Sequence, residues 1–80
     1  MSKRYNILNG GEEMNNAAIG RRLVALRGNR TQEEVAKSLR ISVAAIGMYE
    51  RGERIPRDEI KINLAKYYDT TVQAIFYADD

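Results

Sequence analysis

The arginine and lysine residues of this 80-residue chain are numerous and clustered enough to bind another molecule through their charge. Nine of them fall between residues 20 and 57 against four glutamates, a balance of +5, whereas residues 58–80 carry a balance of −3. Clustered cations bind anions, above all the phosphates of nucleic acids. The alternative is a solvated surface with chance clustering, and charge alone does not decide between the two.

The residue types that most often perform catalysis or hold metals are missing from the sequence. It contains no Cys and no His, which removes disulfides, thiolate metal sites and the commonest general base. An enzyme would then need paired carboxylates or an activated Lys in a pocket, and no such constellation is visible. We therefore expect no enzymatic activity, no catalytic residue, no metal and no cofactor. No apolar run approaches the roughly 18 residues of a membrane span, which predicts a cytoplasmic protein without a membrane partner.

The stretch from Thr31 to Gly52 has the pattern of two short helices joined by a tight turn. Thr31 can cap the first helix, with Glu34 closing a capping box, and Ser42 can cap the second. A connection of only about three residues makes the two helices cross steeply and leaves one side of the second helix free. This is the geometry of a helix-turn-helix, in which the second helix enters the major groove of DNA.

The same stretch resembles the lambda-repressor-like, Cro/cI-type (Xre) helix-turn-helix family. The resemblance is carried by the opening TQEEVA, three apolar core positions and the closing YERG: residues 31–36, Leu39, Ile41, Ile46 and residues 49–52. It extends from about Ile19 to Phe76, and ordered agreement over that length is more specific than a lone motif. The resemblance implies an all-α, compact five-helix DNA-binding domain over residues 17–78, with the helix-turn-helix motif at residues 32–51.

Apolar spacing predicts three further helices around this pair. They cover residues 17–27, residues 57 or 58 to 68, and a short last helix over residues 72–77 that Thr71 can cap. The two turns that separate the later helices contain Gly52 with Pro56, and an Asp-Thr-Thr run. The sequence shows no convincing strand, repeat or low-complexity tract. The expected product is one small domain with a single core.

Residues 1–16 show no helical or strand period and contain an Asn-Gly-Gly turn at residues 9–11, which predicts a flexible N-terminal segment. Two alternatives stay open for this segment. Lys3 and Arg4 could form a basic arm that reaches along the DNA. The Gly-Gly-Glu-Glu run before Met14 could instead be encoded by purine-rich nucleotides resembling a bacterial ribosome-binding site, which would make Met14 the natural start.

Phosphate contacts are expected at the helix ends. Unpaired amides make a helix N-terminus a site for anions, and Gln32 occupies that position, where family members contact phosphate and steady a neighbouring side chain. Thr31 is a cap first and a DNA contact second. The resemblance also implies phosphate contacts from the arginines that follow the second helix: Arg51, Arg54 and Arg57. For each of these residues the alternative is an ordinary solvated side chain, and Arg30 and Arg40 are weaker candidates.

Base readout is expected from the outward positions of the second helix: Ser42, Val43, Ala44, Gly47 and Met48. None of the usual bidentate readers, which are Arg, Lys, Asn and Gln, occurs between residues 42 and 50. Specificity should therefore depend on thymine-methyl contacts and on DNA shape. The alternative is that Val43 or Met48 belongs to the core or to a dimer contact.

Two structural roles complete the expected site. The resemblance implies that Glu50 pairs with Arg27 of the first helix and so fixes the second helix of the motif. The last helix is expected to contribute a two-fold dimer contact from four residues: Val72, Ile75, Phe76 and Tyr77. A symmetric dimer would present two reading helices about one DNA turn apart, roughly 34 Å.

We therefore expect a sequence-specific DNA-binding transcriptional regulator of bacterial or phage type. It should act as a repressor, because blocking polymerase needs only occupancy of the DNA, and bind an inverted-repeat operator in double-stranded DNA as a homodimer. The alternative is a protein-interaction module on the same fold, such as an antitoxin or antirepressor partner. The apolar outer face of the second helix could equally meet a protein.

Overall fold

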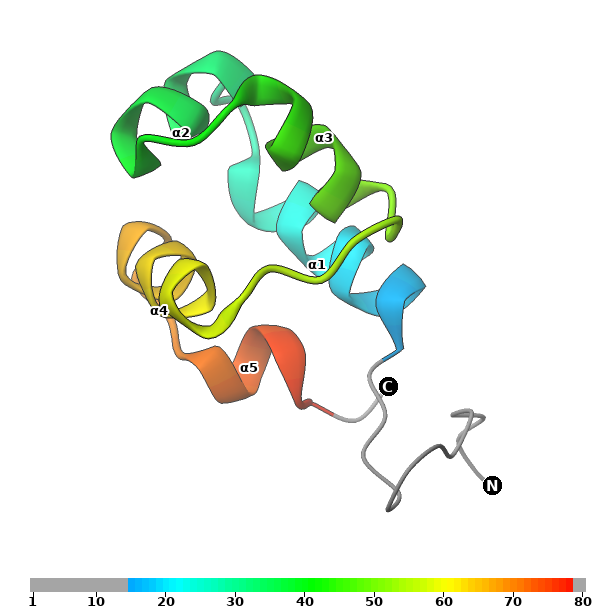
Figure 1. Ribbon diagram of the computed structural model, residues 1–80. Coiled ribbons are helices and arrows are strands. Elements are labelled where there is room, and N and C mark those ends of the chain that lie inside the picture. The colour runs from blue at the N-terminus through cyan, green and yellow to red at the C-terminus, as the bar shows by residue number, and fades with distance from the viewer. Residues whose placement is uncertain (1–14, 79–80) are drawn as a thin grey trace.

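The computed structural model describes residues 15–78, so the expectations for residues 1–14, including the arm and the alternative start at Met14, lie outside this range. The described part holds five helices and no strand. They are α1 (Asn16–Arg27), α2 (Gln32–Leu39), α3 (Val43–Glu50), α4 (Asp58–Tyr67) and α5 (Val72–Phe76) (Figure 1). The all-α, five-helix fold is therefore confirmed, with α1 starting one residue earlier than expected.

Four of the five helices begin with a side-chain cap. The side chains of Asn15, Thr31, Ser42 and Thr71 each accept a hydrogen bond from the backbone amide three residues ahead. At Thr31 the capping box is complete, because Glu34 Oε1 accepts a hydrogen bond from the Thr31 amide at 3.0 Å. Each cap satisfies an amide that the first turn of a helix would otherwise leave unpaired.

Three helices end in the same way, on a residue with left-handed backbone. Arg40, Gly52 and Asp69 have φ of 59°, 75° and 57° after α2, α3 and α4. In each case the next amide donates to a carbonyl five residues earlier, such as the Ile41 amide to the Ala36 carbonyl at 3.0 Å. Arg40 accepts a conformation that favours glycine, and this turn sets the crossing of α2 and α3.

All five helices contribute to the core, with α1 packed against α3 and α5, α2 against α3 and α4, and α4 against α5. Its largest fully buried side chains come from four helices: Ile19, Leu23, Val35, Leu64 and Ile75. The α1 and α3 helices approach so closely that a Cβ on Gly20 would overlap the Glu50 carbonyl oxygen. Glycine at this position therefore lets the backbone of α1 touch the end of α3.

The four residues expected at a dimer contact do not share a free face on α5. Ile75 and Phe76 are 1% and 2% exposed, and Val72 packs against the same core. The side chain of Arg22 in α1 donates to the carbonyls of Ile75 and Ala78, which ties α5 to the core. Ile75 and Phe76 therefore close the core of the monomer, whereas a dimer contact at Val72 and Tyr77 stays a prediction.

Tyr77 is the most exposed member of that expected group, at 42% exposure. Its hydroxyl accepts a hydrogen bond from the buried Lys61 at 3.1 Å. The ammonium of Lys61 also lies 5.6 Å from the centre of the Phe76 ring. The aromatic end of α5 therefore serves in part to satisfy a cation of α4.

Candidate nucleic-acid interface

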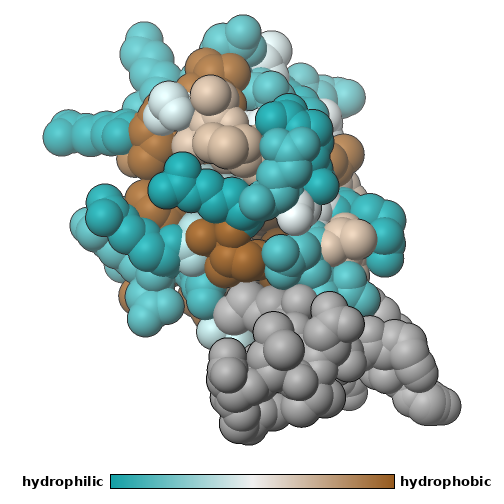
Figure 2. All heavy atoms as spheres, turned by 45° about the vertical axis from the view of Figure 1, so that its right-hand side comes forward, coloured by the Kyte–Doolittle hydropathy of each residue, from teal (hydrophilic) through white to brown (hydrophobic). Residues whose placement is uncertain are grey.

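The α3 helix buries one side and exposes the start of the other. Ile46 and Tyr49 are 2% and 7% exposed and pack into the core. Ser42, Val43 and Ala44 are exposed at the opposite end of the helix, with Val43 at 39%. Figure 2 turns the right-hand side of Figure 1 forward and shows apolar surface in limited areas between hydrophilic side chains. The exposed start of α3 can therefore enter a DNA groove while Ile46 and Tyr49 stay packed in the core.

Gly47 lies on the outer face of α3, but the side chain of Arg51 covers it. It is buried, and a Cβ built on it would lie 2.8 Å from Nη1 of Arg51. The reason is helical spacing, because the side chain four residues further on lies over this position. Met48 is half-buried beside it. The middle of the outer face of α3 is thus covered by a guanidinium.

Arg51 is itself paired at the protein surface. Its Nε donates to Glu53 Oε2 at 3.0 Å, and both side chains are more than half exposed. The hydrogen bond and charge of Glu53 raise the pKa of Arg51, while the hydrogen bond from Arg51 lowers the pKa of Glu53. An exposed pair of this kind is weak and exchanges readily for another anion.

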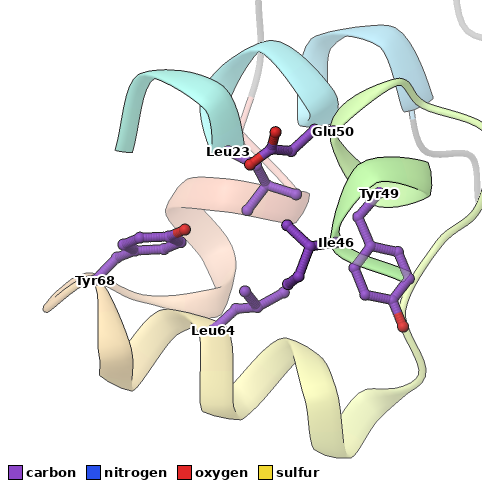
Figure 3. Close-up of a pocket in the computed structure, with 6 residues that line it drawn as sticks. All are labelled: Leu23, Ile46, Tyr49, Glu50, Leu64 and Tyr68. Carbon is purple, nitrogen blue, oxygen red and sulfur yellow. The ribbon is translucent and has the colours of Figure 1, made fainter. Parts of the chain in front are cut away.

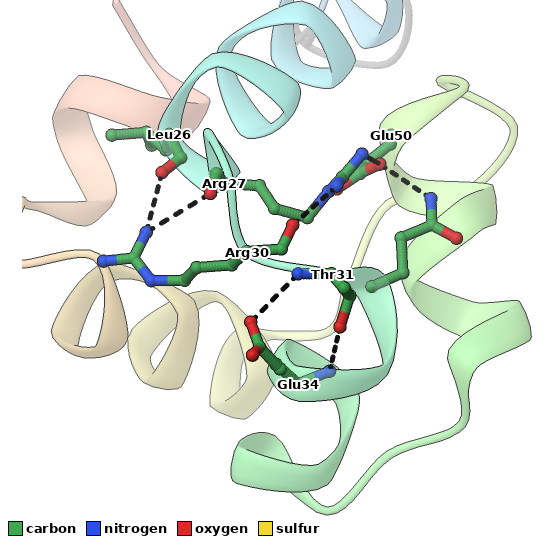
Figure 4. A network of polar contacts seen from close by, with 7 residues as sticks. Leu26, Arg27, Arg30, Thr31, Glu34 and Glu50 are labelled. Carbon is green, nitrogen blue, oxygen red and sulfur yellow. Dashed lines mark hydrogen bonds and ion pairs between the residues drawn. The ribbon is translucent and has the colours of Figure 1, made fainter.

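Glu50 is the centre of a polar network that joins α1, α2 and α3 (Figure 4). Arg27 grips its carboxylate with two donors, at 2.7 Å from Nε to Oε2 and 3.1 Å from Nη2 to Oε1. Gln32 Nε2 donates to Oε1 at 2.8 Å. The Glu50 side chain is only 6% exposed, and its hydrogen bond raises the pKa of Arg27. The structure thus brings Arg27 and Glu50 together as the resemblance implies, with Gln32 as a third member.

Arg30 is directed away from the start of α2. Its Nη1 donates to the Leu26 carbonyl at 3.0 Å, at the end of α1. The guanidinium lies 5.4 Å and 5.5 Å from the ring centres of Tyr67 and Tyr68. This weaker phosphate candidate is therefore occupied within the fold by carbonyls and aromatic faces.

Arg54 and Arg57 are exposed beside the start of α3. Within residues 15–78 neither guanidinium has a hydrogen-bond or ion-pair partner. They lie at a cleft of 360 Å³ between the starts of α3 and α4, whose walls also include Ser42 and Tyr49. This arrangement leaves two unpaired cations next to the exposed turn of α3.

Two tyrosines hold positions that sequence spacing does not distinguish. Tyr68 points toward Glu50, and Tyr49 extends on the other side of α3 toward the segment that leads to α4 (Figure 3). Burial, with the nearby Glu50 charge, raises the pKa of Tyr68 to about 12. The helical spacing predicts a core position for both residues. It does not predict what their hydroxyl groups contact.

Other kinds of site are not visible in the described part of the chain. Residues 15–78 contain no group of three or more Asp or Glu side chains arranged to hold a metal ion. None of the helices in this range combines the length and apolarity that crossing a bilayer requires.

Comparison with known proteins agrees with the geometry. A helix-turn-helix family model matches residues 22–75. The crystal structure of the DNA-binding domain of BldD is similar, with a TM-score of 0.65 and 26% identity over 76% of this chain and 92% of that chain. No curated protein matches the sequence. The chain belongs to the helix-turn-helix family of Xre and lambda-repressor-like DNA-binding domains.

Proposed function

We propose that this protein is a sequence-specific transcriptional regulator that inserts the start of α3 into the major groove of operator DNA. The observation that carries the proposal is the free first turn of α3, flanked by the unpaired Arg54 and Arg57. Such a helix can reach base edges while the two arginines beside it neutralise DNA phosphates. The BldD match, to a domain that binds DNA, supports the same assignment.

Phosphate binding is assigned to three places. The first is the start of α2, where the backbone amides that follow Thr31 and the side chain of Gln32 would contact a DNA phosphate. The second is Arg51, which releases Glu53 and takes a phosphate in its place. The third is the pair of free arginines, Arg54 and Arg57. Each of these contacts positions the protein without reading sequence.

Base recognition is assigned to the exposed residues of α3 and its cap: Ser42, Val43, Ala44 and Met48. The Ser42 hydroxyl already accepts a hydrogen bond from the Ala45 amide and can still donate one to a base or phosphate. Val43 and Ala44 offer methyl groups to thymine. Gly47 contributes indirectly, because its missing side chain makes room for Arg51. The DNA sequence would thus be read through methyl groups and shape more than through hydrogen bonds.

We infer further that the protein represses, and that two copies bind an inverted repeat. Repression needs only occupancy of the operator, and two-fold symmetry would place two α3 helices about 34 Å apart. Of the residues expected at the dimer contact, Tyr77 and the outer part of Val72 remain accessible. A contact built on them would be small and completed by the two half-sites on the DNA.

A protein-interaction module on the same fold is the second candidate. The exposure of Val43 at 39% favours it, because an apolar side chain at a helix start can meet another protein. The two candidates differ in their response to salt. Binding through phosphates weakens steeply with salt, whereas an apolar protein contact does not.

Selection from a random duplex pool, at about 50 mM and about 200 mM salt, tests the proposal. We expect enrichment of an inverted repeat rich in A·T pairs, and a log–log salt slope of about −0.9 for each phosphate neutralised. Enrichment of single half-sites would contradict the dimer. No enriched sequence at either salt, or binding without a salt slope, would contradict DNA recognition itself.

A further inference from the structure

The cleft between the starts of α3 and α4 has the make-up of a small-molecule site. Its volume of 360 Å³ is within the range of ligand pockets in proteins. One part of its wall is apolar: Ile41, Ala45, Ile55 and Ile60. The other part is polar, with the two free guanidinium groups of Arg54 and Arg57. A cleft lined both by apolar side chains and by two cations suits a ligand that carries an apolar and an anionic part.

Tyr49 supplies a second, independent pointer to a ligand. The residue is 7% exposed, lines this cleft, and its hydroxyl has no hydrogen-bond partner within residues 15–78. Figure 3 shows that hydroxyl at the end of the ring away from Glu50, beside the segment that leads to α4. Buried hydroxyls in proteins are normally paired, because an unpaired one loses its hydrogen bonds to water. The phenol can donate to an anionic group inside the cleft.

We propose that this cleft binds a small organic anion with a compact apolar body. The apolar part would lie on Ile55 and Ile60, and the carboxylate or phosphate would accept hydrogen bonds from the Tyr49 hydroxyl and the two guanidinium groups. Charge-assisted hydrogen bonds of this kind are about twice as strong as neutral ones. A neutral ligand of the same shape would leave the cations unused.

The site has a regulatory consequence that rests on the proposed DNA binding. Arg54 and Arg57 would be shared between the ligand and the DNA phosphates, and Ser42 and Ala45 place the cleft directly at the start of α3. A bound anion cancels the positive charge that the phosphates need. The ligand would therefore release the protein from DNA. The first turn of α3 would both contact the bases and border the ligand site.

Amide NMR shifts of the free protein test the site without DNA. The probes are 2-naphthoate and 2-naphthyl phosphate, with 2-naphthylmethanol as the neutral control and inorganic phosphate as the control without an apolar body. We expect saturable shifts at Ser42, Ala45 and Ile60 with at least one naphthyl anion, and about tenfold weaker binding of both controls. Equal binding of either control, shifts located elsewhere, or no saturation up to millimolar ligand would overturn the proposal.

Variants separate the assigned contacts from a general loss of charge. Tyr49→Phe keeps the ring and the packing and removes the hydroxyl, so we expect the Kd of the better naphthyl anion to rise about fivefold with a Tm that stays level or rises. Arg57→Gln should raise the same Kd by about tenfold. Lys66→Gln, which removes an exposed cation at the other end of α4, is the matched control and should change nothing. An unchanged Kd in both Tyr49→Phe and Arg57→Gln contradicts the assignment.

A DNA competition completes the test and keeps the two proposals apart. With a selected duplex, the naphthyl anion should lower DNA affinity in step with the saturation seen by NMR. Full DNA affinity at saturating ligand overturns the regulatory inference. If the protein binds no DNA at all, the proposed function fails, while the NMR titration still decides whether the cleft is a ligand site.

Discussion

The two ends of α3 differ in how many partners they have inside the protein. At the C-terminal end, the Glu50 carboxylate takes hydrogen bonds from Arg27 and Gln32, and the backbone rests on Gly20. At the N-terminal end, Ser42 caps the helix and Val43 stands in solvent. The difference teaches how a short helix can offer one end to a ligand. The anchored end fixes its direction, so the free end needs few internal contacts.

The largest expected effect comes from disturbing the anchored end through its glycine. Gly20→Ala places a Cβ against the Glu50 carbonyl, and the backbone cannot move aside cheaply. We expect a loss of about 3 kcal/mol in the free energy of unfolding, or about 15 °C in Tm, by thermal and urea unfolding.

Gly47→Ala is the matched control for that glycine. Its Cβ would meet only the flexible end of Arg51, and alanine favours the helix by up to about 1 kcal/mol. The Tm of this variant should stay level or rise. Equal losses in the two variants would show that α3 is not anchored through its contact with α1.

The next effect concerns the cations beside the free end. We expect Arg54→Gln with Arg57→Gln to weaken binding to a selected duplex by about 30-fold at low salt, and to make the salt slope shallower by about 2, with an unchanged Tm. Fluorescence anisotropy over a salt series measures both quantities. Lys66→Gln, which removes one positive charge from the far end of α4, is the control for a loss of charge outside the interface. A double variant that binds like this control would remove these arginines from the interface.

A smaller effect lies in the alkaline stability of the anchored end. The pKa of Tyr68 is about 12 in the folded protein and near its ordinary value of 10.0 in the unfolded chain, since burial disfavours the phenolate. Its contribution to stability is therefore complete below pH 10 and disappears as the pH rises through 12. Between about pH 8 and about pH 11, wild type should lose about 1 kcal/mol more than Tyr68→Phe in urea unfolding. Equal losses would mean that the phenol is not held in a low-dielectric site.

The smallest effect tests what the free end reads. Replacing single thymines of the selected operator by uracil removes one methyl group each and should weaken binding by about threefold at positions that contact Val43 or Ala44. In a Val43→Ala variant the penalty should shrink at one of these positions. Unchanged affinity for every uracil-substituted duplex would argue against methyl readout.

The sequence predicted the parts of the fold that depend on neighbours along the chain. The Thr31 capping box, the Ser42 cap and the turn after Gly52 are each set within about four residues, so their signals are local. The pairing of Arg27 with Glu50 spans 23 positions and came from the family resemblance, not from spacing. The covering of Gly47 by Arg51 was within reach of helical spacing, since the two are four residues apart.

Tertiary packing explains what sequence could not decide. An apolar run such as Ile75 and Phe76 reads the same whether it meets its own core or a second copy, and only the position of α5 against α1 separates the two. The cleft at Tyr49 could not be predicted from the sequence for a similar reason. It depends on how the segment between α3 and α4 returns past Ile55 and brings two arginines beside a core tyrosine.

The structure of the protein bound to its selected duplex tests the central claim most directly. We predict that Ser42, Val43 and Ala44 lie against base edges in the major groove, with Arg54 and Arg57 on the phosphates and the Glu50 network unchanged. A complex in which the start of α3 faces another polypeptide or open solvent, with the duplex held elsewhere on the protein, would contradict it.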